Sequence, residues 1–157
     1  MSTTTVFIRI KRALKSGAPL RVTYLIIGTI VLANCQERAV EPVALSPEDM
    51  CDYCKMAISQ NRYAAELIDV EGQAFKFDDI GCMSNFVNRN TAKAAAYFVM
   101  DFDERQWIKA EDAYYMRSPE LTTPMNRGIV AFKDQSRALR AADEYHGKIV
   151  RFNEILE

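Results

Sequence analysis

The feature that most constrains the fold is a pattern that occurs twice in the chain. Two apolar segments, a helical pattern and a third apolar segment follow one another over residues 63–102, and the same order returns over 113–152. Phe77-Asp78-Asp79 precedes the first predicted helix, and Phe132-Lys133-Asp134 precedes the second, 55 residues later. Such units are too small to bury their apolar faces alone. We therefore predict an α+β fold of two tandem ββαβ modules, about 48–104 and 105–157, packed together.

The elements of each module follow from local signals. In the first, strands are predicted over 63–70 and 73–77, joined by a turn at Glu71-Gly72. Asp78 or Asp79 would cap a helix that ends near residue 88, and a strand follows over 95–102. In the second, strands are predicted over 113–117 and 128–132, then a helix capped by Asp134 and stopped by Gly147, then a closing strand over 148–152.

Residues 1–34 have the pattern of a secretory signal peptide. They contain basic residues but no acidic one, and the apolar run over 22–33 is short for a membrane span. The run ends in Leu32-Ala33-Asn34-Cys35, which resembles the lipobox of bacterial lipoproteins and makes Cys35 the predicted lipidation site. An uncleaved anchor helix is the alternative. Residues 35–47 are polar, contain two prolines and are predicted to be the lipidated N-terminus and linker of the domain over 48–157.

Export places the domain in the periplasm, lipid-anchored to a membrane, and the outer membrane is one candidate. Without the leader, the chain has fifteen basic and twenty-one acidic residues, a charge of about −6. A nucleic-acid-binding protein needs a basic surface to neutralise phosphates. The charge therefore argues against a nucleic-acid partner.

The chemistry is concentrated between Met50 and Met56, where two thiols and two thioethers lie within seven residues. The Cys51-x-x-Cys54 spacing lets both sulfurs turn toward one point. Soft sulfur donors bind Cu(I) in preference to hard cations. We predict a soft-metal site in the cleft between the modules. Its predicted ligands are Cys51, Cys54, Met56 and, from the second module, Met125; further candidates are Met50, Cys82 and, as an electrostatic influence, Asp52.

Three other interpretations of the cysteine pair remain open. In an exported protein, Cys51 and Cys54 could form a structural disulfide. They could also serve a thiol–disulfide enzyme, although the acidic, proline-containing segment before them is unlike the buried strand that normally precedes such a motif. A structural zinc site would need four Cys or His donors, and the mature chain adds only Cys82 and His146.

Four features together resemble the NosL family: the lipobox, the cluster over 50–56, the run Phe77-Asp78-Asp79-Ile80-Gly81-Cys82-Met83, and Thr123-Pro124-Met125 before the segment over 128–132. The resemblance implies a fold of paired ββαβ modules and a periplasmic copper-chaperone lipoprotein. It implies a non-enzymatic carrier that delivers Cu(I) to membrane-bound assembly factors for the maturation of nitrous oxide reductase. One departure is Asn126-Arg127 after Met125, where relatives more often have glycine.

Overall fold

The computed structural model describes residues 39–91 and 93–157. The predicted signal peptide and Cys35 lie outside the described residues. The described part has a mixed α/β fold with two antiparallel sheets and three α-helices. None of the helices in these two ranges has the length and apolar character needed to cross a membrane.

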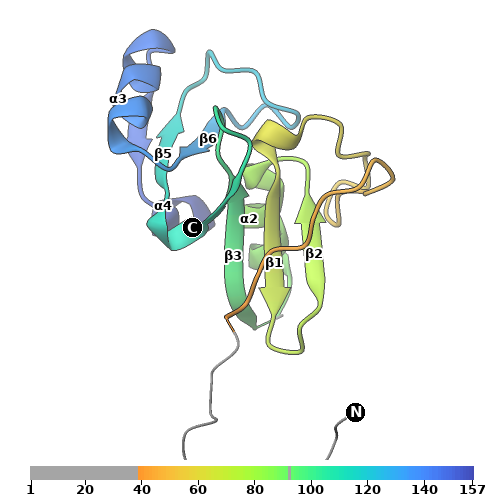
Figure 1. Cartoon of the computed structure of the whole chain (residues 1–157). Helices are drawn as coiled ribbons and strands as arrows, with labels where there is room; N and C mark the ends of the chain where they lie inside the picture. The colour runs from red at the N-terminus through yellow and green to blue at the C-terminus, as the bar shows by residue number, and fades with distance from the viewer. Residues whose placement is uncertain (1–38, 92) are drawn as a thin grey trace, which may run out of the picture. The chain divides into compact units, whose positions relative to one another are not determined.

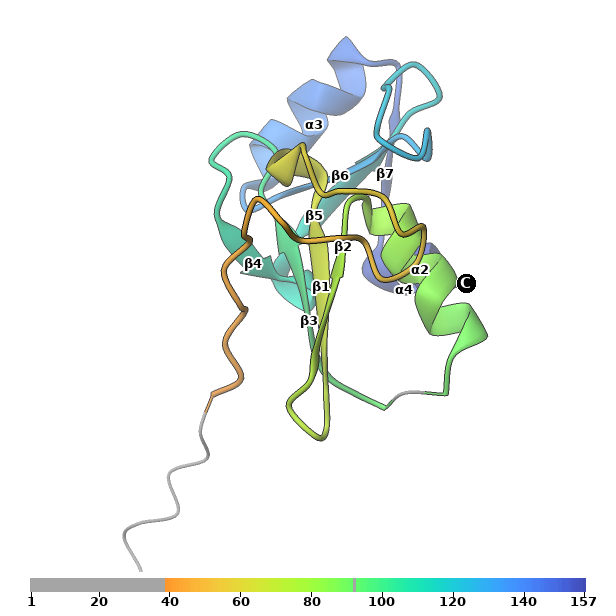
Figure 2. The same cartoon turned by 90° about the vertical axis from the view of Figure 1, so that its right-hand side faces the viewer.

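The first sheet has four strands, and helix α2 covers one of its faces (Figures 1 and 2). Its elements are β1 (Ala65–Asp69), β2 (Ala74–Phe77), α2 (Ile80–Arg89), β3 (Ala94–Met100) and β4 (Trp107–Lys109), with strand order β2-β1-β3-β4. Ala65 lies opposite both Phe77 and Val99 across the ladder, and all three are buried. The face toward α2 is therefore a continuous apolar surface.

The second sheet has three strands, and helix α3 packs against it. Its elements are β5 (Tyr114–Arg117), β6 (Ile129–Phe132), α3 (Gln135–Glu144) and β7 (Lys148–Val150), with strand order β6-β5-β7; α4 (Phe152–Leu156) ends the chain, and short 3₁₀ helices cover Asn61–Tyr63 (η2) and Ala110–Asp112 (η3). In each sheet, the first strand lies between the two strands that a helix connects. β1 lies between β2 and β3, and β5 lies between β6 and β7.

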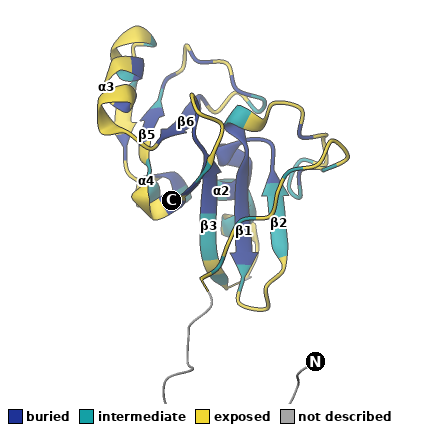
Figure 3. Ribbon diagram, in the orientation of Figure 1, coloured by how far each residue is buried: buried dark blue, intermediate teal, exposed yellow. Residues whose placement is uncertain are grey.

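The two sheets are joined at the end of β3. The Phe102 N–H donates to the Ala131 carbonyl over 2.9 Å, which links the turn after β3 to β6. One hydrophobic cluster includes Val99 from the first sheet and Tyr115 and Ile129 from the second. Figure 3 shows this buried region running through both sheets. The halves therefore share a core, as expected for units too small to fold alone.

The structure differs from the sequence-based prediction at several elements. The first strand begins at Ala65 rather than Tyr63, because Tyr63 belongs to η2. The closing strand ends at Val150 rather than Phe152, because the Glu154 carboxylate accepts from the Arg151 N–H over 3.0 Å and starts helix α4 there. Strand β4 was not predicted. Its three residues are too few to show the alternation of polar and apolar residues by which a strand is recognised.

The segment before the sulfur-rich loop lies across the first sheet (Figure 1). The Val43 N–H donates to the fully buried Glu66 Oε1 over 2.8 Å, and Lys76 Nζ donates to the Ala44 carbonyl over 2.9 Å. Burial raises the pKa of Glu66. Residues 43–44, predicted as linker, are thus in contact with the strands.

Candidate metal site

The loop over 50–56 is a tight turn that brings its two thiols together. The Cys51 N–H donates to the Met56 carbonyl over 2.8 Å, and the Lys55 N–H donates to the Cys51 carbonyl over 2.9 Å. Lys55 lies in the left-handed region, with φ of 63°, which lets the chain reverse at this point. The Cys54 N–H lies 3.5 Å from Cys51 Sγ and donates to it. The backbone of the turn therefore donates a hydrogen bond to the sulfur of Cys51.

Asp52 fixes this loop to strand β2. Its N–H donates to the Lys76 carbonyl over 2.8 Å, and its Oδ2 accepts from the Lys76 N–H over 2.9 Å. Lys76 Nζ in turn donates to Asp49 Oδ2 over 2.6 Å. The Asp52 carboxylate thus bonds to the backbone of strand β2, and it is not among the grouped ligand atoms of the candidate metal site.

Helix α2 supplies the third thiol. Asp79 caps the helix by accepting from the Gly81 N–H over 2.6 Å, which places Cys82 in the first turn. The other carboxylate oxygen of Asp79 accepts from Thr123 Oγ1 over 2.5 Å and from the Met125 N–H over 3.2 Å. One buried aspartate therefore orders both the helix start and the loop before β6.

Asp79 caps the helix, and the carboxylate of its neighbour Asp78 lies among the three cysteines instead. Ligand atoms of Cys51, Cys54, Asp78 and Cys82 all lie within 4.8 Å of one another, a group that could hold a metal ion. We call these four residues the Cys3Asp cluster. The three cysteines are free thiols. Cys54 is half-buried and the other three members are buried, so Cys54 is the member of the cluster that solvent can reach.

Hydrogen bonds within the cluster polarise the thiols. Donation from the Cys82 thiol lowers the pKa of Cys51 to about 6, and the same contact raises the pKa of Cys82 far above its usual range. Burial raises the pKa of Cys54 to about 11. At neutral pH the cluster therefore holds one thiolate, on Cys51, and two protonated thiols.

Asp78 has one oxygen in use and one without a partner. Its Oδ2 accepts from Cys54 Sγ over 3.5 Å. Its Oδ1 is buried and has no hydrogen-bond partner among the described residues. A buried acceptor without a partner is costly in free energy, and a bound cation is one way to remove that cost.

The structure places the predicted methionines differently from the cysteines. Met50 and Met56 are exposed to 52% and 47% on the loop. Met125 is half-buried and, like Cys54, packs against the hydrophobic cluster that contains Cys51 and Cys82. Asp78 was missed as a site residue because the sequence offers it equally as a helix cap. The signal for it was that two adjacent acids precede a helix that needs only one cap.

Fold and site together define a class: a two-sheet α/β domain with three thiols and a carboxylate gathered at a loop–helix junction. The family model for NosL matches residues 42–157, and the chain belongs to the NosL family. Its fold is similar to the crystal structure of the copper chaperone NosL from Shewanella denitrificans, with a TM-score of 0.68 and 19% identity over 74% of this chain and 96% of that one. No curated protein matches the sequence at a significant level.

Proposed function

We propose that this protein is a non-enzymatic carrier that binds Cu(I) and delivers it for the maturation of nitrous oxide reductase. The observation that carries the proposal is the Cys3Asp cluster, in which three sulfurs converge within 4.8 Å. Thiolates and thioethers are the ligands that Cu(I) prefers. Membership of the NosL family and the fold similarity to a copper chaperone support the same conclusion.

The cluster has the properties that a carrier of Cu(I) needs. Cys51 supplies a thiolate before the ion arrives, and Cys54 supplies a second sulfur that an incoming ligand can reach. Thioethers of Met56 and Met125 are the weaker ligands in this proposal, and they would complete the site without preventing release. Exchange with an acceptor would begin at Cys54, because Cys51 is fully buried.

We also propose the setting of this activity. The acid-free leader and the lipobox-like end at Cys35 support a periplasmic lipoprotein, anchored to a membrane through that residue. The acceptors would be membrane-bound assembly factors of nitrous oxide reductase. The matching strand orders β2-β1-β3 and β6-β5-β7 support the interpretation of the domain as two tandem ββαβ modules.

An anaerobic titration against a Cu(I) chelator tests the proposal. The reduced protein should bind one Cu(I), and Cys51→Ala should weaken binding at least about 100-fold, because loss of a ligand exceeds the loss caused by outer-shell changes. Met116→Leu is the matched control, since it removes a buried sulfur from the other hydrophobic cluster. Unchanged affinity in Cys51→Ala would exclude the site.

One observation favours a second function, a thiol–disulfide protein that uses Cys51 and Cys54. A pKa of about 6 for Cys51 is low enough to give a reactive thiolate at neutral pH. However, Cys51 is 0% exposed, so a disulfide substrate cannot reach its sulfur without opening of the loop. Rapid alkylation of Cys51 and reduction of a model disulfide by the purified protein would favour this second function over the first.

A further inference from the structure

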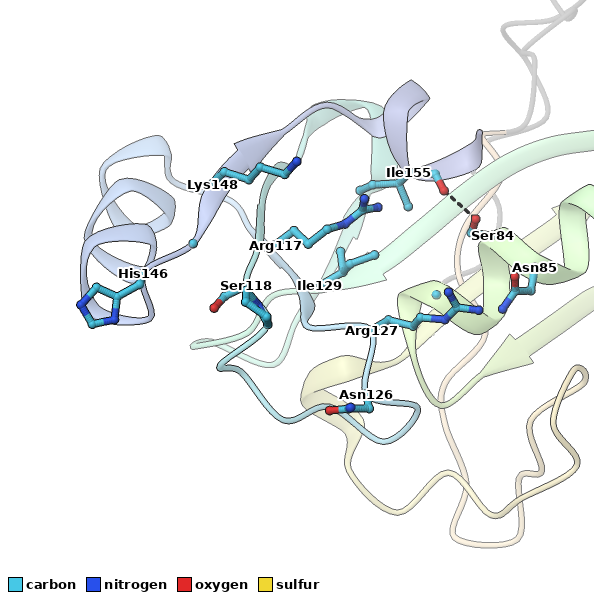
Figure 4. A pocket seen from close by; sticks show the side chains of 13 residues that line it. Ser84, Asn85, Arg117, Ser118, Asn126, Arg127, Ile129, His146, Lys148 and Ile155 are labelled. Carbon is cyan, nitrogen blue, oxygen red and sulfur yellow. Dashed lines mark hydrogen bonds between the residues drawn. The ribbon is translucent and has the colours of Figure 1, made fainter.

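A second candidate site lies beside helix α2 and is separate from the Cys3Asp cluster. It is a cavity of about 560 Å³ lined by residues from α2, β5, β6, β7, α4 and the loops before β6 and β7 (Figure 4). Gly81 and Ser84 face it from α2, and Ser84 Oγ donates to the Ile155 carbonyl over 2.5 Å. No member of the Cys3Asp cluster lines it. Helix α2 therefore presents Cys82 to one site and Gly81 and Ser84 to another.

The cavity is basic, although the domain as a whole is acidic. Arg117, Arg127 and Lys148 line it, and none of the three takes part in a salt bridge within the described residues. Its lining among those residues contains no Asp or Glu. His146 at the edge is already paired with Glu120 over 2.9 Å. Three cations thus meet at one cavity without a protein counter-charge.

The backbone pairing makes this charge arrangement unfavourable in the absence of a ligand. Arg117 on β5 lies directly opposite Lys148 on β7 in the antiparallel ladder. Like charges in that position repel each other and destabilise a sheet. Arg117 Nε is also buried and has no hydrogen-bond partner among the described residues. Both the repulsion and the missing partner would be relieved by an anion between the two strands and α2.

We propose that this cavity binds a small organic anion that carries carboxylate or phosphate groups. The planar guanidinium of Arg117 matches the geometry of either group, and Lys148 and Arg127 supply the remaining charge. Ile129 and Ile155 give an apolar surface for the carbon skeleton. The volume lies in the range of small-molecule sites.

The position of Arg127 is fixed by a neighbouring glycine. A Cβ built on Gly81 would lie 2.3 Å from Arg127 Cγ, so only glycine lets the arginine stem lie against the first turn of α2. Figure 4 shows the Arg127 side chain extended toward Asn85. The side chain is exposed, so its substitution leaves the core untouched.

Isothermal titration calorimetry on the reduced, metal-free full chain tests the proposal. Two probes separate the two anion chemistries: tricarballylate, which carries carboxylates, and inorganic phosphate, each at ionic strength matched with sodium chloride. We expect saturable binding of at least one probe at one site per chain. Arg117→Gln and Arg127→Gln should each weaken that binding at least about tenfold, because each removes a charge-assisted contact. Two variants are used because Arg117 is partly buried and Arg127 is not.

The matched control is Arg140→Gln, which removes the same charge from the exposed face of α3, away from this cavity. It should bind the probe as the parent does. Cu(I) binding should be unchanged in all three variants, which separates failure here from failure of the copper site. Absence of saturable binding of both probes, or equal weakening in Arg140→Gln, would overturn the proposal.

Discussion

The turn before α2 and the turn before α3 share one framework and carry different chemistry. A buried phenylalanine ends each preceding strand, Phe77 in the first and Phe132 in the second. Two residues later an aspartate caps each helix, Asp79 and Asp134. Asp79 is buried, whereas Asp134 is exposed and bonds only within its own turn, to Ser136 and Arg137.

The two turns differ in the residues that flank the capping aspartate. Asp78 precedes the first cap and Cys82 follows it, and both belong to the Cys3Asp cluster. Lys133 and Arg137 hold the matching positions in the second half, where Arg137 Nε donates to Asp103 over 2.8 Å. The cap fixes the helix start in both halves, so the neighbouring positions are free to hold a sulfur cluster in one and an ion pair in the other.

The largest expected difference between the two turns is in the stability that each capping aspartate contributes. Asp79→Ala should lower the free energy of unfolding by roughly 3 kcal/mol, because Gly81, Thr123 and Met125 all lose an acceptor in a buried place. Asp134→Ala should cost less than half as much, since water can replace an exposed cap. Urea unfolding of both variants measures the difference, and equal losses would show that the two caps are equivalent.

The acid–base behaviour of the sulfur cluster gives a second test. Cu(I) displaces the proton of each thiol that it binds, so affinity rises with pH. Above pH 6 Cys51 is already a thiolate, whereas below that value its proton must also leave. The dependence of log Kd on pH should therefore steepen by about one unit per pH unit below a pH of about 6.

Chelator competition between pH 5 and 8 measures this break in slope. Cys51→Ser provides the control, because the shifted group is absent and the slope should remain constant over the same range. A break of equal size in that variant would assign the titration to a different group.

Met125 tests whether the second half contributes to the site of the first. Met125→Leu keeps volume and apolarity and should change the stability of the metal-free protein by less than about 1.5 kcal/mol. It should reduce the extra stability conferred by Cu(I) by about 1 kcal/mol, because the closing thioether is lost. Thermal melts with and without Cu(I) decide the matter. A less stable metal-free variant with a full copper-induced shift would make Met125 a core residue only.

The smallest effect concerns the basic cavity of the second half. Lys148→Glu replaces a like-charge pair with an opposite-charge pair across β5 and β7. Stability should rise by up to about 0.5 kcal/mol, and binding of the anion probe that the parent protein binds should be lost. Urea unfolding and calorimetry on the same preparation measure both. Loss of stability together with retained binding would contradict the charge argument.

The sequence was sufficient where the signals are local. Asp134 caps a helix as predicted, and short apolar runs locate β1 and β6. The left-handed residue after that helix is His146 rather than the predicted Gly147. These features depend on a few neighbouring residues and on elementary backbone geometry.

The membership of the candidate site depends on contacts that local patterns do not contain. Asp78 and Cys82 reach Cys54 only because Asp52 joins the sulfur loop to β2 and Asp79 sets the start of α2. The like-charge pair at the basic cavity likewise appears only when the register of β5 against β7 is known. Tertiary packing therefore decides which of many polar residues meet.

The crossing of residues 43–44 over the first sheet has a mechanical consequence. A pulling force that enters at the N-terminal end of the described chain would first load the Val43–Glu66 and Lys76–Ala44 hydrogen bonds. These bonds join the chain to two strands, β1 and β2, so the load would spread into the sheet before it reached Cys51. Pulling on residues 39–42 would therefore have to break these two hydrogen bonds before it changed the geometry of the thiols.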